Sequence, residues 1–140
     1  MTKEVLVQVS GMQYEVDSEN PTVLVAAGTY YLKNGKHYIL YDEIDDDGQV
    51  SKNVIKISEQ AVEVIRKGVV ASHMVFEKGK ENLTYYDVPY GSILMSIYTS
   101  KLQFVEKSSS RMELEIEYRL SVDGNYLSDC KIDITVTAQL

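Results

Sequence analysis

Cysteine, histidine and proline are scarce in this chain, and tryptophan is absent. The 140 residues include one cysteine, two histidines and two prolines. A single cysteine excludes an intramolecular disulfide and a thiolate-rich metal site. Cys130 lies on the apolar side of an alternating run, so we expect a small buried hydrophobe and not a reactive thiol. Because His37 and His73 have no second ligand nearby in sequence, we expect no metal and no cofactor.

Long apolar runs and an excess of positive charge are also missing. No stretch approaches the roughly eighteen apolar residues that a membrane helix requires. The first ten residues, MTKEVLVQVS, contain no signal-peptide pattern. Acidic residues outnumber basic ones by 21 to 14, and the resulting charge of -7 opposes binding to a phosphate backbone. We therefore expect a cytoplasmic protein with neither nucleic acid nor a membrane as its partner.

Helical periodicity is absent as well, and strict alternation takes its place near the C-terminus. Apolar residues alternate with charged or polar ones from Arg111 to Leu120 and again from Cys130 to Ala138. A period of two is typical of strands with one buried face, and the intervening Asp-Gly indicates a hairpin. Apolar residues face each other when Ile116 pairs with Ile132. That register predicts a three-residue loop over residues 123–125.

Further strands are separated by short polar segments. An Asn34-Gly35 turn predicts a hairpin that pairs Leu32 with His37, and Gly28 with Tyr41. Residues 42–49 are expected to form an acidic loop. The other expected strands cover residues 5–9, 22–32, 50–57, 61–67, 69–77, 83–88 and 92–106.

The fold class that follows is all-β, with residues 1–140 in a single domain. The chain is rich in Val, Ile, Tyr and Thr, which favour strands. Sequential hairpins favour one antiparallel up-and-down β-barrel of about 8–10 strands, because closure removes exposed sheet edges. A β-sandwich is the alternative.

The segment Tyr85–Thr99, with Pro-Tyr-Gly at its centre, resembles the YwiB-like family of bacterial proteins. Ile65-Arg66-Lys67-Gly68, the segment from Met74 to Gly79, Gly28-Thr-Tyr-Tyr and the closing hairpin carry the same resemblance, which runs nearly end to end. It implies a calycin-type, lipocalin-like barrel in a cytoplasmic setting, with no established activity or catalytic residues. Val88 departs from the family pattern, where a Thr is expected before the proline.

Arg66 is the leading candidate for a ligand contact. It follows Val62 and Val64 on one face of a strand, and an inward arginine is costly unless it is paired. The resemblance implies a relation to calycin-type fatty-acid carriers. These proteins hold a ligand carboxylate with an interior arginine and a tyrosine hydroxyl. Alternatively, Arg66 lies at the strand end with its head in water.

We therefore predict a non-catalytic barrel that binds a small amphipathic or anionic molecule in its mouth. His37 should point inward or lie at the rim, and tyrosines, apolar in body and polar at the tip, suit a pocket wall. The candidate ligand-binding residues are Arg66, His37, Tyr30, Tyr41, Tyr86, Tyr90 and Tyr118.

Three other interpretations are weighed against this one. Tyr85, Tyr90 and Tyr98 could form an exposed patch that docks a protein, or the Pro-Tyr-Gly segment could only bend the chain. A small hydrolase would need convergent carboxylates, of which only Glu77 or Asp87 could point inward. Residues 45–48, Asp-Asp-Asp-Gly, hint at a calcium loop, but valine stands at position 54 where a bidentate glutamate belongs.

Overall fold

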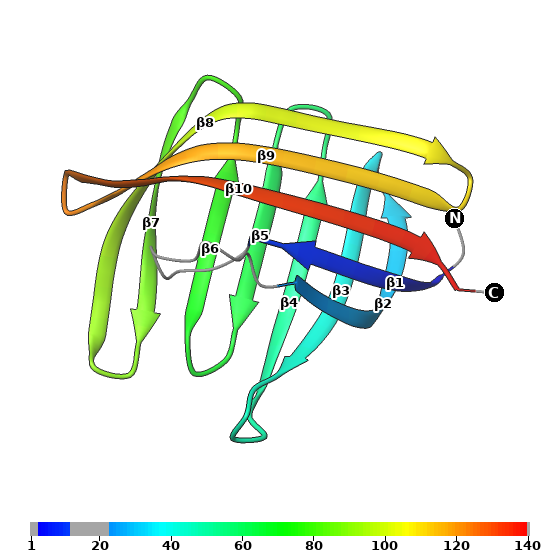
Figure 1. Ribbon diagram of the computed structural model, residues 1–140, viewed down its shortest axis with the longest axis horizontal. Coiled ribbons are helices and arrows are strands. Elements are labelled where there is room, and N and C mark those ends of the chain that lie inside the picture. The colour runs from blue at the N-terminus through cyan, green and yellow to red at the C-terminus, as the bar shows by residue number, and fades with distance from the viewer. Residues whose placement is uncertain (1–2, 12–22, 140) are drawn as a thin grey trace.

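The computed structural model describes residues 3–11 and 23–139, and all regular structure in these ranges is β-strand (Figure 1). The strands are β1 (Glu4–Ser10), β2 (Val23–Lys33), β3 (Lys36–Ile44), β4 (Val50–Ile57), β5 (Val62–Lys67), β6 (Ala71–Phe76), β7 (Glu81–Val88), β8 (Gly91–Ser108), β9 (Arg111–Val122) and β10 (Asn125–Ala138). The described ranges contain no helix with the length and apolar character needed to cross a membrane.

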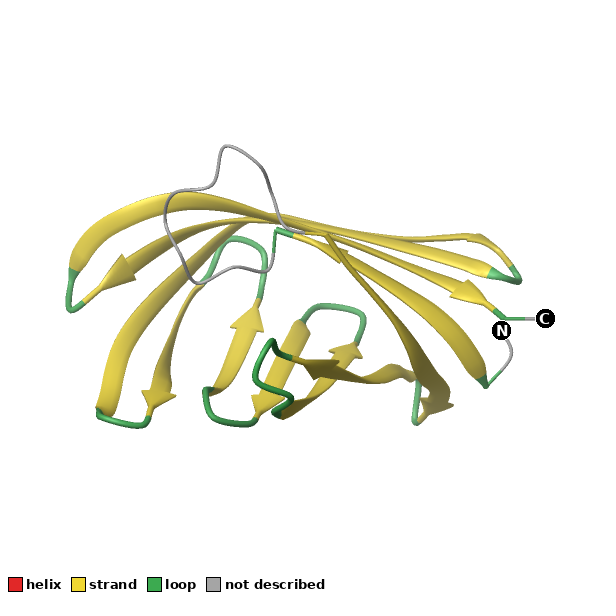
Figure 2. Cartoon of the chain, turned by 60° about the horizontal axis from the view of Figure 1, so that its bottom comes forward, coloured by secondary structure: helices red, strands yellow, loops and turns green. Residues whose placement is uncertain are grey.

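The strands form a closed antiparallel barrel. Each strand pairs with its neighbours in sequence, and β1 pairs with β10 to close the ring. In Figure 1, β9 and β10 run across β3 to β6, and Figure 2 shows the strands arranged as two facing walls. Every strand is therefore paired on both sides over at least part of its length. The predicted up-and-down barrel is therefore confirmed, and the sandwich alternative does not apply.

Alternation along the strands explains where the core lies. Successive side chains of a strand point to opposite faces, so one apolar set from each strand fills the barrel. Ile39, Ile55, Ile116 and Ile132 have no exposed surface. Each such side chain contributes about 1.5–3 kcal/mol to folding through burial.

The β9–β10 hairpin has the predicted register but a different turn. Ile116 lies opposite Ile132, as predicted. The turn has two residues, Asp123 and Gly124, because Val122 pairs with Asn125, and both turn residues have positive φ angles of 50° and 84°. The predicted three-residue loop was wrong. An irregularity between Tyr126 and Ser128 absorbs the extra residue and restores the apolar pairing.

The β2–β3 hairpin was predicted correctly. Leu32 pairs with His37 and Gly28 with Tyr41, around an Asn34-Gly35 turn. Gly28 allows the backbones to approach, since a Cβ there would lie 2.7 Å from the Leu40 carbonyl oxygen. The predicted acidic loop began too early, because β3 continues to Ile44.

Candidate functional site

A row of polar side chains crosses the inside of the barrel near the turns that join β3 to β4 and β5 to β6. Along this row, Tyr41 pairs with Asn53, Asn53 with Arg66, Arg66 with Ser72, and Ser72 with Tyr86. We call these five residues the polar row. They share the inner face because core residues flank them at a spacing of two along each strand.

The sequence predicted part of this row. Arg66, Tyr41 and Tyr86 were candidate ligand contacts, and all three lie on this row, with Tyr41 and Tyr86 each two strands away from Arg66. Asn53 and Ser72 were missed, although they are only 3% and 6% exposed. The alternation of Asn53 with Ile55, and of Ser72 with Met74, would have placed both inside.

Arg66 is partly buried and forms an ion pair. Its Nη2 lies 2.8 Å from Oε2 of Glu43, and the two side chains are 21% and 28% exposed. The Nε–H of Arg66 is buried and has no hydrogen-bond acceptor in the structure. Glu43 was assigned to the acidic loop, but it follows Ile39 and Tyr41 in the inward alternation of β3. One donor of the guanidinium fork is therefore unused.

The amide of Asn53 is only weakly satisfied. Its Nδ2 donates to the carbonyl oxygen of Ser51 at 3.4 Å, which is long for a hydrogen bond. This amide lies beside Arg66 in the ladder. The polar row thus combines a positive fork with neutral donors, and this combination suits an anionic group.

His37 and Tyr30 lie away from the polar row. The Tyr30 hydroxyl and His37 Nδ1 are 2.7 Å apart, and His37 Nε2 is 3.3 Å from Oε1 of Glu106. The His37 ring also packs on Phe104, with 5.1 Å between ring centroids. Burial, followed by the charge of Glu106, raises the pKa of the Tyr30 phenol. We call Tyr30, His37, Phe104 and Glu106 the histidine cluster.

The ladder separates these two sites along the strands. Within β3, His37 pairs with Ile57 whereas Tyr41 pairs with Asn53, so the fully buried Ile39 lies between them. Four residues of extended strand span roughly 13 Å. His37 does lie at a rim, as expected, since its side chain is 15% exposed. His37 and Arg66 could therefore contact the same molecule only if that molecule extended across the core.

The two remaining tyrosine candidates lie elsewhere. Tyr90 is 86% exposed in the turn between β7 and β8. Tyr118 is buried and meets the edge of Phe76 at a centroid distance of 5.0 Å. The structure therefore brings neither of them into the polar row.

The acidic residues considered for hydrolysis and for calcium binding also lie apart from one another. Asp87 is exposed and accepts a hydrogen bond from the Ser92 hydroxyl, while Glu77 pairs with Lys80 at 3.5 Å. The carboxylate of Asp45 accepts two backbone N–H groups of its own loop at 2.9 Å. Across residues 3–11 and 23–139, no group of three His, Cys, Asp or Glu side chains could hold a metal ion. Cys130 is partly exposed.

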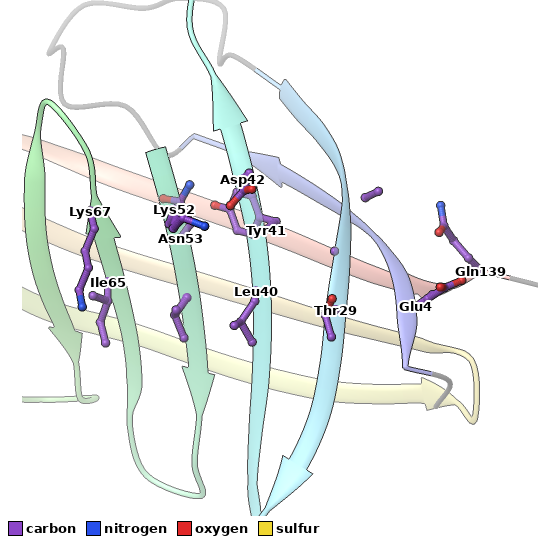
Figure 3. A pocket seen from close by; sticks show the side chains of 13 residues that line it. Glu4, Thr29, Leu40, Tyr41, Asp42, Lys52, Asn53, Ile65, Lys67 and Gln139 are labelled. Atoms are coloured by element: carbon purple, nitrogen blue, oxygen red, sulfur yellow. The ribbon is translucent and has the colours of Figure 1, made fainter. Parts of the chain in front are cut away.

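A separate hollow of about 700 Å³ lies on the outer face of β2 to β5 (Figure 3). Most of its lining comes from outward-facing residues of these strands, and Glu4 and Gln139 border one end. The lining residues include Ala27, Thr29, Leu40, Asp42, Lys52, Val54, Ile65 and Lys67. Tyr41 and Asn53 of the polar row also line it, but strand alternation did not predict the hollow, because outward positions were interpreted only as solvated.

Comparison with known proteins gives a consistent result. The model of a domain of unknown function, DUF1934, matches residues 7–134. An uncharacterized β-barrel protein from Bacillus subtilis, YwiB, is 27% identical over 106 residues, which cover 75% of this chain and 74% of YwiB. The crystal structure of the B. subtilis ywiB protein superposes with a TM-score of 0.74 at 24% identity, covering 98% of this chain and 91% of that one. The calycin-type assignment stays a prediction.

Proposed function

The chain belongs to the DUF1934 family of domains of unknown function and is YwiB-like, and from this premise we propose that the barrel binds a small anionic molecule at Arg66. The proposed function is non-catalytic. It rests mainly on one observation, the buried Nε–H of Arg66 that has no acceptor in the structure. A buried donor without a partner costs about 1–3 kcal/mol, so an acceptor that fills this position gains correspondingly.

A carboxylate or phosphate fits this position because a guanidinium group can donate two parallel hydrogen bonds to two oxygens of the same anion. Glu43 occupies only Nη2, and its side chain is 28% exposed. It can therefore turn toward water when a ligand oxygen takes its place. A ligand group that accepts from both Nε and Nη2 would leave the positive charge of Arg66 neutralised.

The remaining residues of the polar row support an amphipathic ligand. Asn53 and Ser72 flank Arg66 in the ladder and offer neutral hydrogen-bonding groups. Tyr41 and Tyr86 stand at the two ends of the row, each two strands from Arg66, and a tyrosine ring at either end offers apolar surface to a ligand held at Arg66. A small molecule with one anionic group and a short apolar body matches this arrangement.

The test is intact mass spectrometry of the purified protein under native and denaturing conditions. We expect a noncovalent extra mass in the native spectrum, and Arg66→Gln should reduce its occupancy at least about tenfold. Glu43→Gln should raise the occupancy, because it removes the competing carboxylate. Arg119→Gln is the matched control, since Arg119 is 62% exposed and pairs with Asp129 outside the barrel.

Two results would contradict the proposal. One is a native mass that equals the polypeptide mass in both the parent protein and Glu43→Gln, with no binding of added acetate, benzoate or phosphate. The other is an extra mass that survives Arg66→Gln unchanged. The opposite responses of Arg66→Gln and Glu43→Gln separate a binding role from simple loss of structure, because both substitutions break the same ion pair.

A second candidate function is protein docking on the outer face of β7 and β8. Tyr85 is 61% exposed and Tyr98 is 42% exposed, and Leu83 beside them is 66% exposed. Tyr90 in the adjoining turn extends this apolar surface. Such a cluster is larger than the scattered apolar residues of an ordinary surface.

Quantitative affinity capture tests this second candidate. A partner captured from lysate should be lost with Leu83→Ser combined with Tyr85→Ser, and retained with Leu127→Ser, an exposed leucine in β10. A partner that binds the parent and the double variant equally would rule out docking at this face.

A further inference from the structure

We propose that the outer hollow over β2 to β5 is a second binding site, which takes an amphipathic anion with its head group at Lys52 and Lys67. This inference does not depend on the proposed function, because the lysines and apolar residues that carry it lie on the outer face of the strands and Arg66 does not line the hollow, although Tyr41 and Asn53 of the polar row do. Its volume of about 700 Å³ falls within the usual range for small-molecule sites, about 300–1,000 Å³.

The floor of the hollow is an apolar stripe. Leu40 pairs with Val54, and Val54 pairs with Ile65, so the three side chains lie side by side on three strands. All three are only partly covered by the rest of the chain. In Figure 3, Leu40 and Ile65 lie in the lower part of the hollow, Lys52 lies above them, and the side chain of Lys67 runs down beside Ile65. The stripe provides a surface on which an alkyl or aromatic body can lie.

Lys52 and Lys67, on one side of the stripe, form no ion pair within the described residues. Lys52 and Lys67 are cross-strand partners, and like charges placed directly opposite each other destabilise a sheet. Neither has an acidic oxygen within 4.0 Å in the described ranges. By contrast, Lys56 on the other side of the stripe is 3.5 Å from Glu63. An anion between Lys52 and Lys67 would relieve their repulsion.

The residues around the hollow also limit its occupant. Asp42 is the cross-strand partner of Lys52 and offsets part of its charge, whereas the partner of Lys67 in the ladder is Lys52 itself. On the other side of the stripe, Lys56 lies over the Tyr38 ring at 5.7 Å and is already paired with Glu63. The head group is therefore expected near Lys67, with the apolar body directed along the stripe toward Leu40.

Amide chemical-shift mapping of the full-length protein tests this site. The probes are decanoate and decyl phosphate, with decyltrimethylammonium as a cation of equal chain length, all below their micelle concentrations. We expect both anions to shift the amide signals of Leu40, Val54 and Ile65. The cation should bind at least about fivefold more weakly. The tighter of the two anions identifies the preferred head group.

Variants separate the charge from the apolar contribution. Lys52→Gln combined with Lys67→Gln should weaken decanoate binding about fivefold, while Lys33→Gln, an exposed lysine outside the hollow, should leave it unchanged. Val54→Thr keeps a β-branched side chain and should also weaken binding. Arg66→Gln should have no effect on these shifts, which distinguishes this site from the polar row.

Three outcomes would overturn the inference. The first is a set of shifts that avoids the stripe. The second is equal affinity for the anions and the cation, which would indicate a nonspecific apolar surface. The third is unchanged decanoate affinity after both lysines are replaced in a protein whose spectrum remains that of the folded barrel.

Discussion

The polar row and the histidine cluster both place ionisable side chains inside or at the rim of one barrel, but their hydrogen bonding differs. In the histidine cluster, both ring nitrogens of His37 have partners, at 2.7 Å and 3.3 Å. In the polar row, one donor of Arg66 has no acceptor, and the Asn53 amide has only a long contact. The hydrogen bonds of His37 are therefore satisfied within the fold, whereas the polar row keeps the unused donor on which the proposed anion site rests.

The largest expected effect comes from removing one member of the Arg66–Glu43 pair. Glu43→Leu should lower the free energy of unfolding by about 2–3 kcal/mol, because the charge of Arg66 remains partly buried without a partner. Combining it with Arg66→Met should recover most of that loss, since an apolar pair of similar volume has no charge to desolvate. Urea denaturation measures both values.

Recovery in the double variant would show that the ion pair is not required for stability, which sharpens the contrast with the histidine cluster. A double variant as unstable as Glu43→Leu alone would show that the pair has a structural role. The polar row would then resemble the histidine cluster.

His37→Phe should have a smaller effect on stability. The ring volume is retained, but the Tyr30 hydroxyl and the Glu106 carboxylate both lose their partner. The expected cost is about 1–2 kcal/mol by thermal or urea denaturation. Binding of an anion at the polar row should be unchanged, since Ile39 separates the two sites. Altered anion affinity in His37→Phe would show that the two sites are coupled.

Tyrosine ionisation gives a direct measure of the histidine cluster. The pKa of Tyr30 is raised by burial and by Glu106, so this phenol should ionise after the exposed tyrosines as pH rises above 10.0. The native state then binds a proton that the unfolded state has lost, and stability should fall with pH in that range. Absorbance at 295 nm should show a late tyrosine titration, and its amplitude should fall by one phenol in Tyr30→Phe.

The smallest effect is expected on the outer face. Burial would raise the pKa of Glu63, but the hydrogen bond with His73 and the charge of Lys56 outweigh it and lower the pKa below 4.5. Glu63 therefore stabilises the fold above this pH, and its contribution is lost as pH falls through the lowered value. Glu63→Gln should cost a few tenths of a kcal/mol, about 0.2–0.5, at pH 7 and nothing at pH 2.

Denaturation at the two pH values measures this difference. His73→Gln serves as the matched variant, because it removes the partner at 2.8 Å and leaves the Lys56 contact in place. An equal loss of stability from Glu63→Gln at both pH values would show that its charge does not contribute.

Local patterns predicted the strands and much of their pairing. The register of Ile116 with Ile132 followed from alternation alone, because a shift by one residue would move the apolar set into water. The same logic failed at the β9–β10 turn. Alternation fixes only how many residues in total separate the two paired segments. It does not show how many of them belong to the turn and how many to a bulge, so the irregularity near Leu127 was not predictable.

The candidate site was only partly predictable for a related reason. Arg66 was placed inward by its spacing from Val62 and Val64, and its ladder neighbours include Asn53. Glu43 was missed because its acidic surroundings resemble a loop, although it continues the alternation of Tyr41. Tyr30 was grouped with Arg66, since sequence spacing on separate strands does not reveal the height of a residue along the barrel.

The all-β class, the antiparallel order of the strands and the composition of the core follow from the sequence alone, because they depend on alternation and turn residues within short segments. The pairing of β1 with β10 and the contacts of Arg66 with Glu43 and of His37 with Glu106 became evident only from the folded barrel. These contacts depend on the relative heights of paired strands around a closed barrel. That stagger arises from the sum of all ten registers and is not encoded in any single segment.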